Sequence, residues 1–209
     1  MSWQADTLAC QRGGRVLLAG LSLRLAKGQV LILRGPNGVG KTTLLRTLAG
    51  LQPAAGGTLN WPADDMAYAS HADGIKATLS ARENLAFWAG IYGAGDPENA
   101  LETFGLTPLA GRAAGTLSAG QRRRLGLARL VLSHRPVWLC DEPTVSLDAE
   151  HTEVFANAVR AHCAKGGAAV LATHIDLGLT GETLDLTPFA AAAAQATQTE
   201  TPGFDEAFL

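Results

Sequence analysis

The first candidate for chemistry is a glycine-rich segment with the pattern G-x-x-x-x-G-K-[ST]. The predicted nucleotide site takes in Gly35, Pro36, Asn37, Gly38, Val39, Gly40, Lys41, Thr42 and Thr43. Backbone N–H groups of such a loop point at phosphate oxygens, and the dipole of a following helix adds positive potential. Lys41 is expected to reach the β- and γ-phosphates, and the Thr42 hydroxyl to bind Mg²⁺. An ordinary glycine turn is the alternative, but the segment lies between a buried-type strand and a helix, which favours phosphate binding.

Two adjacent carboxylates form the second candidate. Asp141 and Glu142 come directly after the apolar run Val137 to Cys140, which is typical of a strand buried on both faces. In open α/β sheets, ligands bind at the carboxyl ends of the strands. One carboxylate can hold Mg²⁺ while its neighbour, pointing the other way, polarises an attacking water. Two acids at a strand end can also be a solvated loop, but the preceding glycine-rich segment favours the chemical interpretation.

Three further features follow in a fixed order. Leu117-Ser118-Ala119-Gly120-Gln121 precedes the acidic strand, Asp148 follows it, and His174 ends the next apolar strand. Taken alone, Ser118 is a suitable helix N-cap, and Arg122-Arg123-Arg124 would form a solvated basic face on that helix. A lone histidine at a strand end is most often structural. The order of these features, rather than any one of them, indicates function.

The elements that must position these residues alternate between strands and helices. Leu21 to Leu25 has the period of two of a half-buried strand, and Val30 to Leu33 is a short apolar run. Helices are expected at 41–49, 82–92, 97–104, 118–132 and 149–165, and further strands at 58–61, 137–140 and 168–173. Such alternation predicts an α/β fold with a mainly parallel sheet. We also expect a small antiparallel β portion near the N-terminus and a helical subdomain around 80–132.

Length and composition predict one main folded domain. The chain has 209 residues, of which 47% are hydrophobic and 17% charged, well away from the composition of disordered chains. We expect this domain to span 1–188. A flexible tail is expected over 189–209, where Ala, Gln, Thr and Pro are frequent.

The charge balance and the cysteines limit the partners and the compartment. With 17 basic and 19 acidic residues, the net charge is −2, so no global positive field attracts nucleic acid or anionic lipid. Cys10, Cys140 and Cys163 fit neither a disulfide framework nor a metal motif, which favours a reducing cytoplasm. Because no apolar run reaches about 18 residues, we expect no direct membrane insertion and attachment to a membrane only through another chain. No nucleic-acid partner is expected.

In this combination and order, the motifs resemble those of the nucleotide-binding subunits of ABC transporters, over residues from about 5 to 185. The signature motif of that family is LSGGQ, and here it has alanine at its third position. The resemblance implies an ABC-type P-loop ATPase in which Asp141 is the Walker B carboxylate, Glu142 the general base and His174 a contact to the γ-phosphate. It assigns Asp148 to the D-loop. Two such domains pack head to tail in this family, so ATP would lie between the P-loop of one copy and Ser118, Gly120 and Gln121 of the other.

Three positions depart from the ABC pattern. The stretch 68–73 has no glutamine at the start of the loop that meets the membrane partner in that family, and His71 or Asp73 could take its place. The aromatic residue that stacks on adenine is missing near Gln11 and Arg12, where the guanidinium plane of Arg12 is a candidate. The usual Ser-Ala-Leu-Asp is Val-Ser-Leu-Asp at 145–148. These departures bear on coupling and adenine affinity more than on hydrolysis.

Within the ABC family, the sequence resembles the ATP-binding subunits of bacterial haem exporters used in cytochrome c maturation. The residues that carry this resemblance are Cys10 to Arg15, Gly74 to Lys76, Leu79, Glu83 to Phe87, and the run LSAGQRRRLGLARL from Leu117. It implies an ATP-dependent homodimer with ATP and Mg²⁺ as cofactors, held by a separate integral membrane permease at the cytoplasmic side of the inner membrane. The alternatives are a subunit of another small ABC exporter or importer, a soluble ABC ATPase outside transport, and a nucleotide switch without hydrolysis.

Overall fold

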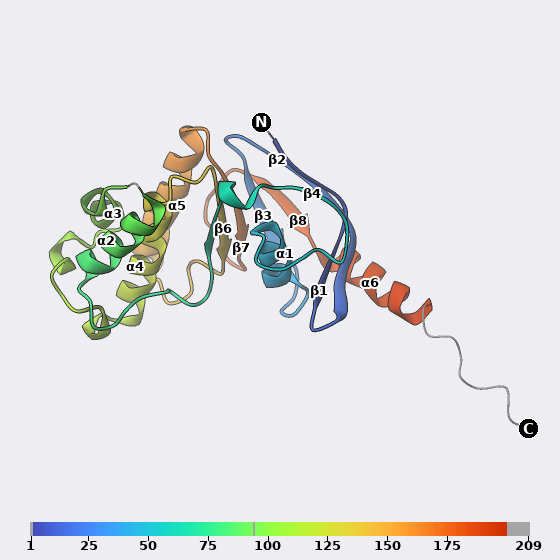
Figure 1. Ribbon diagram of the computed structural model, residues 1–209, viewed down its shortest axis with the longest axis horizontal. Helices are drawn as coiled ribbons and strands as arrows, with labels where there is room; N and C mark the ends of the chain where they lie inside the picture. The colour runs from blue at the N-terminus through green and yellow to red at the C-terminus, as the bar shows by residue number, and fades with distance from the viewer. Residues whose placement is uncertain (1, 94, 200–209) are drawn as a thin grey trace, which may run out of the picture.

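The computed structural model describes residues 2–93 and 95–199 and contains two β-sheets with helices around them (Figure 1). The strands are β1 (Ser2–Arg12), β2 (Arg15–Ala26), β3 (Val30–Arg34), β4 (Gly56–Asn60), β5 (Met66–Ala69), β6 (Val137–Asp141), β7 (Ala168–Ala172) and β8 (Glu182–Asp185). The helices are α1 (Lys41–Leu48), α2 (Ala81–Tyr92), α3 (Pro97–Thr103), α4 (Ala119–Leu132), α5 (Ala149–Ala164) and α6 (Thr187–Thr199). Every helix and strand predicted from the sequence is present, although several begin or end elsewhere.

The five-stranded sheet confirms the predicted parallel α/β core. Its strand order is β5-β6-β7-β3-β8, and every pair of neighbours is parallel. Side chains of the central strands alternate between two hydrophobic clusters: Ile32 and Leu171 belong to one, and Leu31 and Val170 to the other. Burial on both faces explains why these strands are continuous apolar runs in the sequence.

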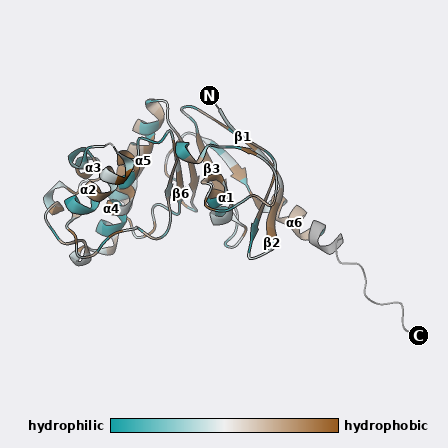
Figure 2. Ribbon diagram, viewed as in Figure 1, coloured by the Kyte–Doolittle hydropathy of each residue, from teal (hydrophilic) through white to brown (hydrophobic). Residues whose placement is uncertain are grey.

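A different layer covers each face of this sheet (Figure 1). On one side, α1 lies between the two sheets, and its residues Leu44, Leu45 and Leu48 join both in one cluster. On the other side, α5 packs against β7 through the cluster that contains Phe155. Helices α2, α3 and α4 pack on one another within the predicted span 80–132. Figure 2 shows mixed hydrophobic and hydrophilic colouring on these helices, as expected for helices with one buried side.

The antiparallel β portion near the N-terminus is a three-stranded sheet in the order β2-β1-β4. The sequence predicted a single strand at 21–25. The structure has two longer strands here, β1 and β2, of which β2 contains the predicted one. They form a hairpin in which Arg12 pairs with Arg15 across Gly13 and Gly14, whose φ values are 57° and 80°. Positive φ at both central residues is what a type I′ turn requires. The Gly-Gly pair is therefore the sequence signal that could have revealed β1.

The C-terminal segment differs from the flexible tail expected over 189–209. Helix α6 runs from Thr187 to Thr199 and packs against β2. Phe189 and Ala190 lie against the hydrophobic cluster beneath that strand, and Ala193 is buried. Tertiary contact, rather than intrinsic propensity, stabilises a short helix of this kind. The remainder of the expected tail, 200–209, lies outside the described residues.

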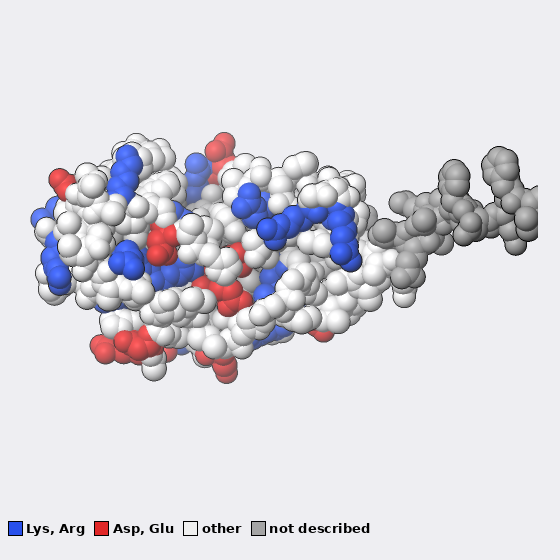
Figure 3. Space-filling model, turned by 90° about the horizontal axis from the view of Figure 1, so that it is seen from below, with Lys and Arg blue, Asp and Glu red and all other residues white. Residues whose placement is uncertain are grey.

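The surface and the cysteines bear on the environment of the chain. On the face seen in Figure 3, acidic and basic side chains are interspersed. No helix within the described residues is long and apolar enough to cross a membrane. Cys10, Cys140 and Cys163 are free thiols, and burial raises the pKa of Cys140 to about 12. Cys140 is therefore a core residue rather than a nucleophile.

Candidate active site

The glycine-rich loop joins the end of β3 to the start of α1. Gly35, Gly38 and Gly40 have φ values of 139°, 81° and 118°, a region that residues other than glycine rarely adopt. Gly40 is the N-cap of α1, and no side chain caps the helix there. The N–H groups of the first turn are therefore available to an external acceptor, which suits an anion.

Lys41 lies folded over this loop. The residue is 7% exposed, and its Nζ donates hydrogen bonds to the carbonyls of Gly35 at 2.8 Å and Pro36 at 3.4 Å. The next two residues continue α1, with Thr42 partly exposed and Thr43 buried. The loop therefore holds the Lys41 ammonium group close to backbone N–H groups. Phosphate oxygens bound there would contact both.

The two carboxylates at the end of β6 have different surroundings. Asp141 is 1% exposed, and its Oδ2 lies 3.5 Å from both Tyr68 Oη and His71 Nε2. Burial, followed by the charge of Asp141, raises the pKa of Tyr68 to about 12, so this phenol stays neutral. Glu142 has a φ of 46°, and its N–H donates to the Ala172 carbonyl at 2.9 Å. A left-handed residue other than glycine persists only where its surroundings hold it, which is common at active sites.

His174 connects the glycine-rich loop to Glu142. Its Nε2 lies 2.9 Å from Lys41 Nζ and 3.0 Å from Asn37 Oδ1. The same atom is 3.3 Å from Glu142 Oε1, and the imidazole is 48% exposed. The structure thus brings together three predicted site elements, namely the loop before α1, the end of β6 and the end of β7.

Arg34, which the sequence analysis did not select, positions the turn that carries His174. Its Nη1 donates to the Thr173 carbonyl at 2.5 Å, and its Nη2 donates to the Ile175 carbonyl at 3.0 Å. These two carbonyls flank His174 along the chain. The sequence signal that could have revealed Arg34 is a charged residue at the end of an apolar strand, because a charge there requires hydrogen-bond partners.

The segment 117–121 begins α4 as its N-cap pattern predicts. Ser118 Oγ accepts from the Gln121 N–H at 3.2 Å, and Gln121 Oε1 accepts from the Ser118 N–H at 2.9 Å. These reciprocal bonds form a capping box. Gly120 lies so close to the following loop that a Cβ there would be 2.8 Å from the Ser146 carbonyl oxygen. Asp148, two residues further, is the N-cap of α5.

The same segment lies apart from the glycine-rich loop of its own chain. Helix α4 is grouped with α2 and α3, across the parallel sheet from α1 (Figure 1). In the part of the chain that the structure describes, no hydrogen bond or ion pair joins 117–121 to the loop. One chain therefore brings together only part of the predicted set.

The two candidates for the missing glutamine have different surroundings. The side chain of His71 is 58% exposed and 3.5 Å from Asp141 Oδ2. Asp73 forms an ion pair with Arg123, with 2.9 Å between Oδ1 and Nη1. Of the two, His71 is exposed beside Asp141 at the end of β6, whereas Asp73 is held by its ion pair with Arg123.

Arg12, the candidate for adenine stacking, is exposed beside the β1–β2 turn. Gln11 next to it is partly buried, and its carbonyl accepts from Gln52 Nε2 at 3.0 Å. The hairpin reaches the glycine-rich loop through Leu18, whose Cγ would lie 3.0 Å from a Cβ at Gly40. The hairpin that carries Arg12 therefore borders the loop.

The solvated basic face predicted at 122–124 is wrong for two of the three arginines. Arg123 and Arg124 are 5% and 7% exposed. Arg124 donates to the carbonyls of Phe104 and Gly105 at 2.9 Å and 3.1 Å, and Arg123 binds two segments near the carboxylates. Three adjacent charges do not reveal which of them face inward, because that depends on the helices and loops packed around α4.

Comparisons with known proteins agree with this arrangement. Residues 18–145 match the ABC transporter family. The chain belongs to the ABC transporter family. The "Cytochrome c biogenesis ATP-binding export protein CcmA" of Rhodobacter capsulatus is 58% identical over 208 residues, which cover 98% of this chain and 97% of that protein. Proteins of the same name from Roseobacter denitrificans and Paracoccus denitrificans are 56% and 55% identical, with 100% and 96% of both chains covered.

Solved structures support the ABC fold independently. An ABC transporter ATP-binding protein from Pyrococcus furiosus has a TM-score of 0.81 at 22% identity, covering 90% of this chain and 99% of that one. The predicted fold class is therefore confirmed, and the family match together with the relatives above confirms the predicted activity class. The chain is an ABC-type ATPase that binds nucleotide and couples hydrolysis to transport.

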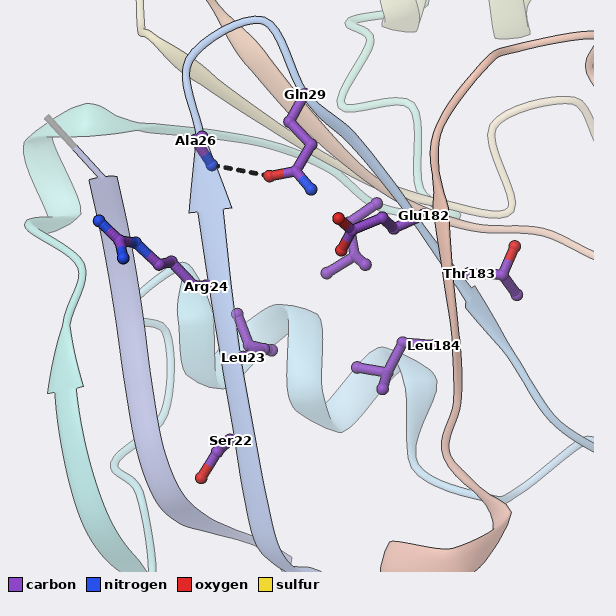
Figure 4. Close-up of a pocket in the computed structure, with 9 residues that line it drawn as sticks. Ser22, Leu23, Arg24, Ala26, Gln29, Glu182, Thr183 and Leu184 are labelled. Atoms are coloured by element: carbon purple, nitrogen blue, oxygen red, sulfur yellow. Dashed lines mark hydrogen bonds between the residues drawn. The ribbon is translucent and has the colours of Figure 1, made fainter.

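A separate cavity of about 530 Å³ opens between two sheet edges (Figure 4). Its polar lining residues come from β2, from the residue before β3 and from β8, and they are Ser22, Arg24, Gln29, Glu182 and Thr183. Gln29 Oε1 accepts from the Ala26 N–H at 2.8 Å and so closes the turn between β2 and β3. None of the predicted ABC site residues lines this cavity.

Proposed function

We propose that this chain is the ATP-hydrolysing subunit of a bacterial inner-membrane transporter that exports haem, or drives haem transfer, for the assembly of c-type cytochromes. The observation that carries the proposal is 55% to 58% identity, over nearly the whole chain, to proteins named for ATP-binding export in cytochrome c biogenesis. We place the subunit at the cytoplasmic side of the membrane, held by a separate integral membrane permease. Neither nucleic acid nor direct membrane insertion has a part in this proposal.

The phosphates of ATP would bind residues 35–43, between the N-terminus of α1 and Lys41. The Thr42 hydroxyl and the Asp141 carboxylate would hold Mg²⁺, because hard oxygen ligands are those that Mg²⁺ prefers. Asp141 fits this role: it is 1% exposed, yet its Oδ2 lies no closer than 3.5 Å to Tyr68 Oη and His71 Nε2. Bound Mg²⁺ would neutralise charge on the phosphates.

Glu142 is the general base in this proposal. A water in line with the γ-phosphorus transfers a proton to the Glu142 carboxylate as its oxygen attacks and ADP leaves. His174 contacts the γ-phosphate, and its position 3.3 Å from Glu142 Oε1 also orients the base. Lys41, 2.9 Å from the same imidazole, links this group to the phosphate loop.

Bound ATP would join two copies of the chain head to tail. The separation of 117–121 from the loop of its own chain supports this arrangement, since a second copy can present that segment to the nucleotide. Ser118, Gly120 and Gln121 would then place the N-terminus of α4 at the phosphates. Asp148 in the D-loop lies near this contact. Hydrolysis would release the dimer and so move the permease.

We assign the ABC ATPase domain to 1–188, with a helical subdomain around 80–132; helix α6, which runs on to Thr199, packs against β2 of this domain. Arg12 would stack on adenine through its guanidinium plane. His71 is the better placed substitute for the missing glutamine, because Asp73 is already paired with Arg123.

Glu142→Gln tests the shared-site mechanism. The amide keeps the size of the side chain but cannot accept the proton, so hydrolysis is expected to fall about 100-fold or more while ATP binding survives. Size-exclusion chromatography with light scattering in MgATP should show an ATP-dependent dimer, in the complex with the permease if isolated chains associate weakly. Adding Ser118→Arg should abolish that dimer by placing a bulky cation at the helix N-terminus. A dimer that survives Ser118→Arg, or a Glu142→Gln form that stays monomeric with its partner, contradicts the mechanism.

The same variant tests the transport assignment in cells. When Glu142→Gln replaces the chromosomal copy, c-type cytochromes are expected to lack covalently bound haem, measured by haem staining of gels. A wild-type copy on a plasmid should restore the stain. Normal cytochrome haem in cells that carry only the inactive subunit would favour another small ABC transporter.

A further inference from the structure

Arg123 of α4 binds the end of β6, where the two carboxylates lie. The residue is 5% exposed. Its Nε donates to the Pro143 carbonyl at 2.9 Å, and its Nη2 donates to the carbonyls of Asp141 at 3.2 Å and Glu142 at 2.9 Å. Three successive carbonyls therefore converge on one guanidinium.

The same guanidinium binds the loop that follows β5. Nη1 of Arg123 donates to the Ser70 carbonyl at 2.7 Å and to Asp73 Oδ1 at 2.9 Å. A guanidinium has five N–H groups, and with these bonds all five have an acceptor. Arg123 therefore connects segment 70–73 directly to the end of β6.

Segment 70–73 and Gly74 lie directly on α4. Positions 123, 126 and 129 lie three residues apart and share one face of the helix. A Cβ at Gly126 would lie 2.7 Å from the Cβ of Asp73, so the loop touches the helix backbone there. Arg129 donates from Nη1 to the Asp73 carbonyl and from Nη2 to the Tyr68 carbonyl, both at 3.2 Å. Loop and helix are thus packed as one unit.

The backbone that Arg123 holds is strained. Glu142 has a φ of 46°, a left-handed conformation that is unfavourable for a residue with a Cβ. Such a conformation persists only when its surroundings determine it. The carbonyls on either side of this residue and its own carbonyl are bound by Arg123, which therefore fixes the direction in which the Glu142 side chain leaves the strand.

We propose that Arg123 is a positioning residue for ATP hydrolysis, which keeps Glu142 aligned while segment 70–73 is docked on α4. A displacement of that segment pulls on Asp73 and thereby on the guanidinium that holds the base. The loop, the signature helix and the base are thus coupled through one side chain. This inference rests on the proposed role of Glu142 as general base.

Arg123→Lys is the main test. Lysine keeps the charge, but its three donors leave from one atom and cannot reach two segments in the fork geometry of arginine. The kcat for ATP hydrolysis is expected to fall about 10-fold or more, with the ATP dissociation constant unchanged within about 2-fold. Both are measured on the complex with the permease, the second with a fluorescent nucleotide.

Arg124→Lys is the matched control. Arg124 is equally buried in the same helix, but it binds the carbonyls of Phe104 and Gly105 in the helical region rather than the end of β6. Its substitution is expected to lower the unfolding midpoint, although by less than Arg123→Lys because fewer hydrogen bonds are lost, and to leave kcat within about 2-fold. Equal losses of kcat in the two variants would reduce Arg123 to a packing role and overturn the inference.

Asp73→Asn gives a second test that spares the carbonyl contacts. It removes the ion pair with Arg123 but not the bonds to residues 141–143, so basal kcat should fall less than in Arg123→Lys. In the double variant, kcat should be no lower than in Arg123→Lys alone, because both changes act through one contact. Additive losses would contradict the coupling, as would full kcat in a folded Arg123→Lys.

Absence of hydrolysis in the wild type, or full hydrolysis in Glu142→Gln, would instead contradict the proposed function.

Discussion

The glycine-rich loop is built from neighbours in the chain, whereas the contact between α4 and segment 70–73 joins Arg123 to Asp73, 50 positions away. In the loop, Lys41 bonds to carbonyls five and six residues before it, and glycines supply the unusual φ values. At the contact between α4 and segment 70–73, the Arg123 side chain supplies the hydrogen-bond donors. Gly126, which has no side chain, allows Asp73 to approach the helix backbone.

We expect this difference to separate nucleotide binding from turnover. A local loop keeps its shape when distant elements move, so it can hold phosphate throughout a cycle. A contact between distant segments can open and close as a unit. We therefore expect changes in the loop to affect nucleotide affinity, and changes at the α4 contact to affect kcat and stability.

Lys41→Ala should have the largest effect. It removes the positive charge that meets the phosphates, and ATP affinity is expected to fall about 100-fold or more. The unfolding midpoint should change little, because the lost hydrogen bonds are only those to the carbonyls of Gly35 and Pro36 and to His174. Isothermal titration calorimetry with ATP and thermal unfolding measure the two quantities. Wild-type affinity in this variant would refute the P-loop assignment.

Gly126→Ala tests the other region. Alanine normally stabilises a helix by about 1 kcal/mol over glycine, but here the added Cβ would lie 2.7 Å from the Asp73 Cβ and 3.0 Å from its backbone. We expect the free energy of unfolding to fall by about 1 to 3 kcal/mol and kcat to drop, while ATP affinity is retained.

Gly90→Ala in α2 is the matched control for that change. A Cβ at Gly90 would meet no atom within 4 Å, so this variant is expected to gain about 0.5 to 1 kcal/mol. Urea unfolding compares the two alanines. A stabilised Gly126→Ala would show that loop and helix are not packed as closely as described.

Tyr68, whose hydroxyl lies near Asp141 and whose carbonyl accepts from Arg129 of α4, should give the smallest effect. Burial and the nearby Asp141 raise its pKa from 10.0 to about 12. Above pH 10 the unfolded chain therefore loses this proton before the folded chain does, so the contribution of Tyr68 to stability declines as the pH rises from about 10 towards 12. Tyr68→Phe should remove that part of the decline, as measured by urea unfolding below and above pH 10.

In an absorbance titration, Asp141→Asn should bring the Tyr68 pKa part of the way back towards 10; an unchanged pKa would exclude the Asp141 charge as a cause.

Local patterns in the sequence predicted the parts of the fold that short segments determine. The apolar runs at 30–33, 137–140 and 168–173 are the buried parallel strands β3, β6 and β7. The N-cap at Ser118 is present as predicted. Strand β8 was missed because Glu182–Asp185 has no apolar run, and its pairing with β3 is what makes it a strand. Helix α6 was missed for a similar reason, since its packing against β2 holds it.

The sequence by itself determined the phosphate loop, the acidic strand end and the order of motifs, because glycine conformation, strand burial and helix capping act over a few residues. Only the tertiary structure decided that Arg123 and Arg124 are buried, that Asp73 is bound by Arg123, and that Arg34 holds the turn around His174. These contacts depend on which segments the sheet and the helical region bring together. A charged side chain carries no mark of its future partner, and its burial becomes favourable only when several distant backbone carbonyls meet around it.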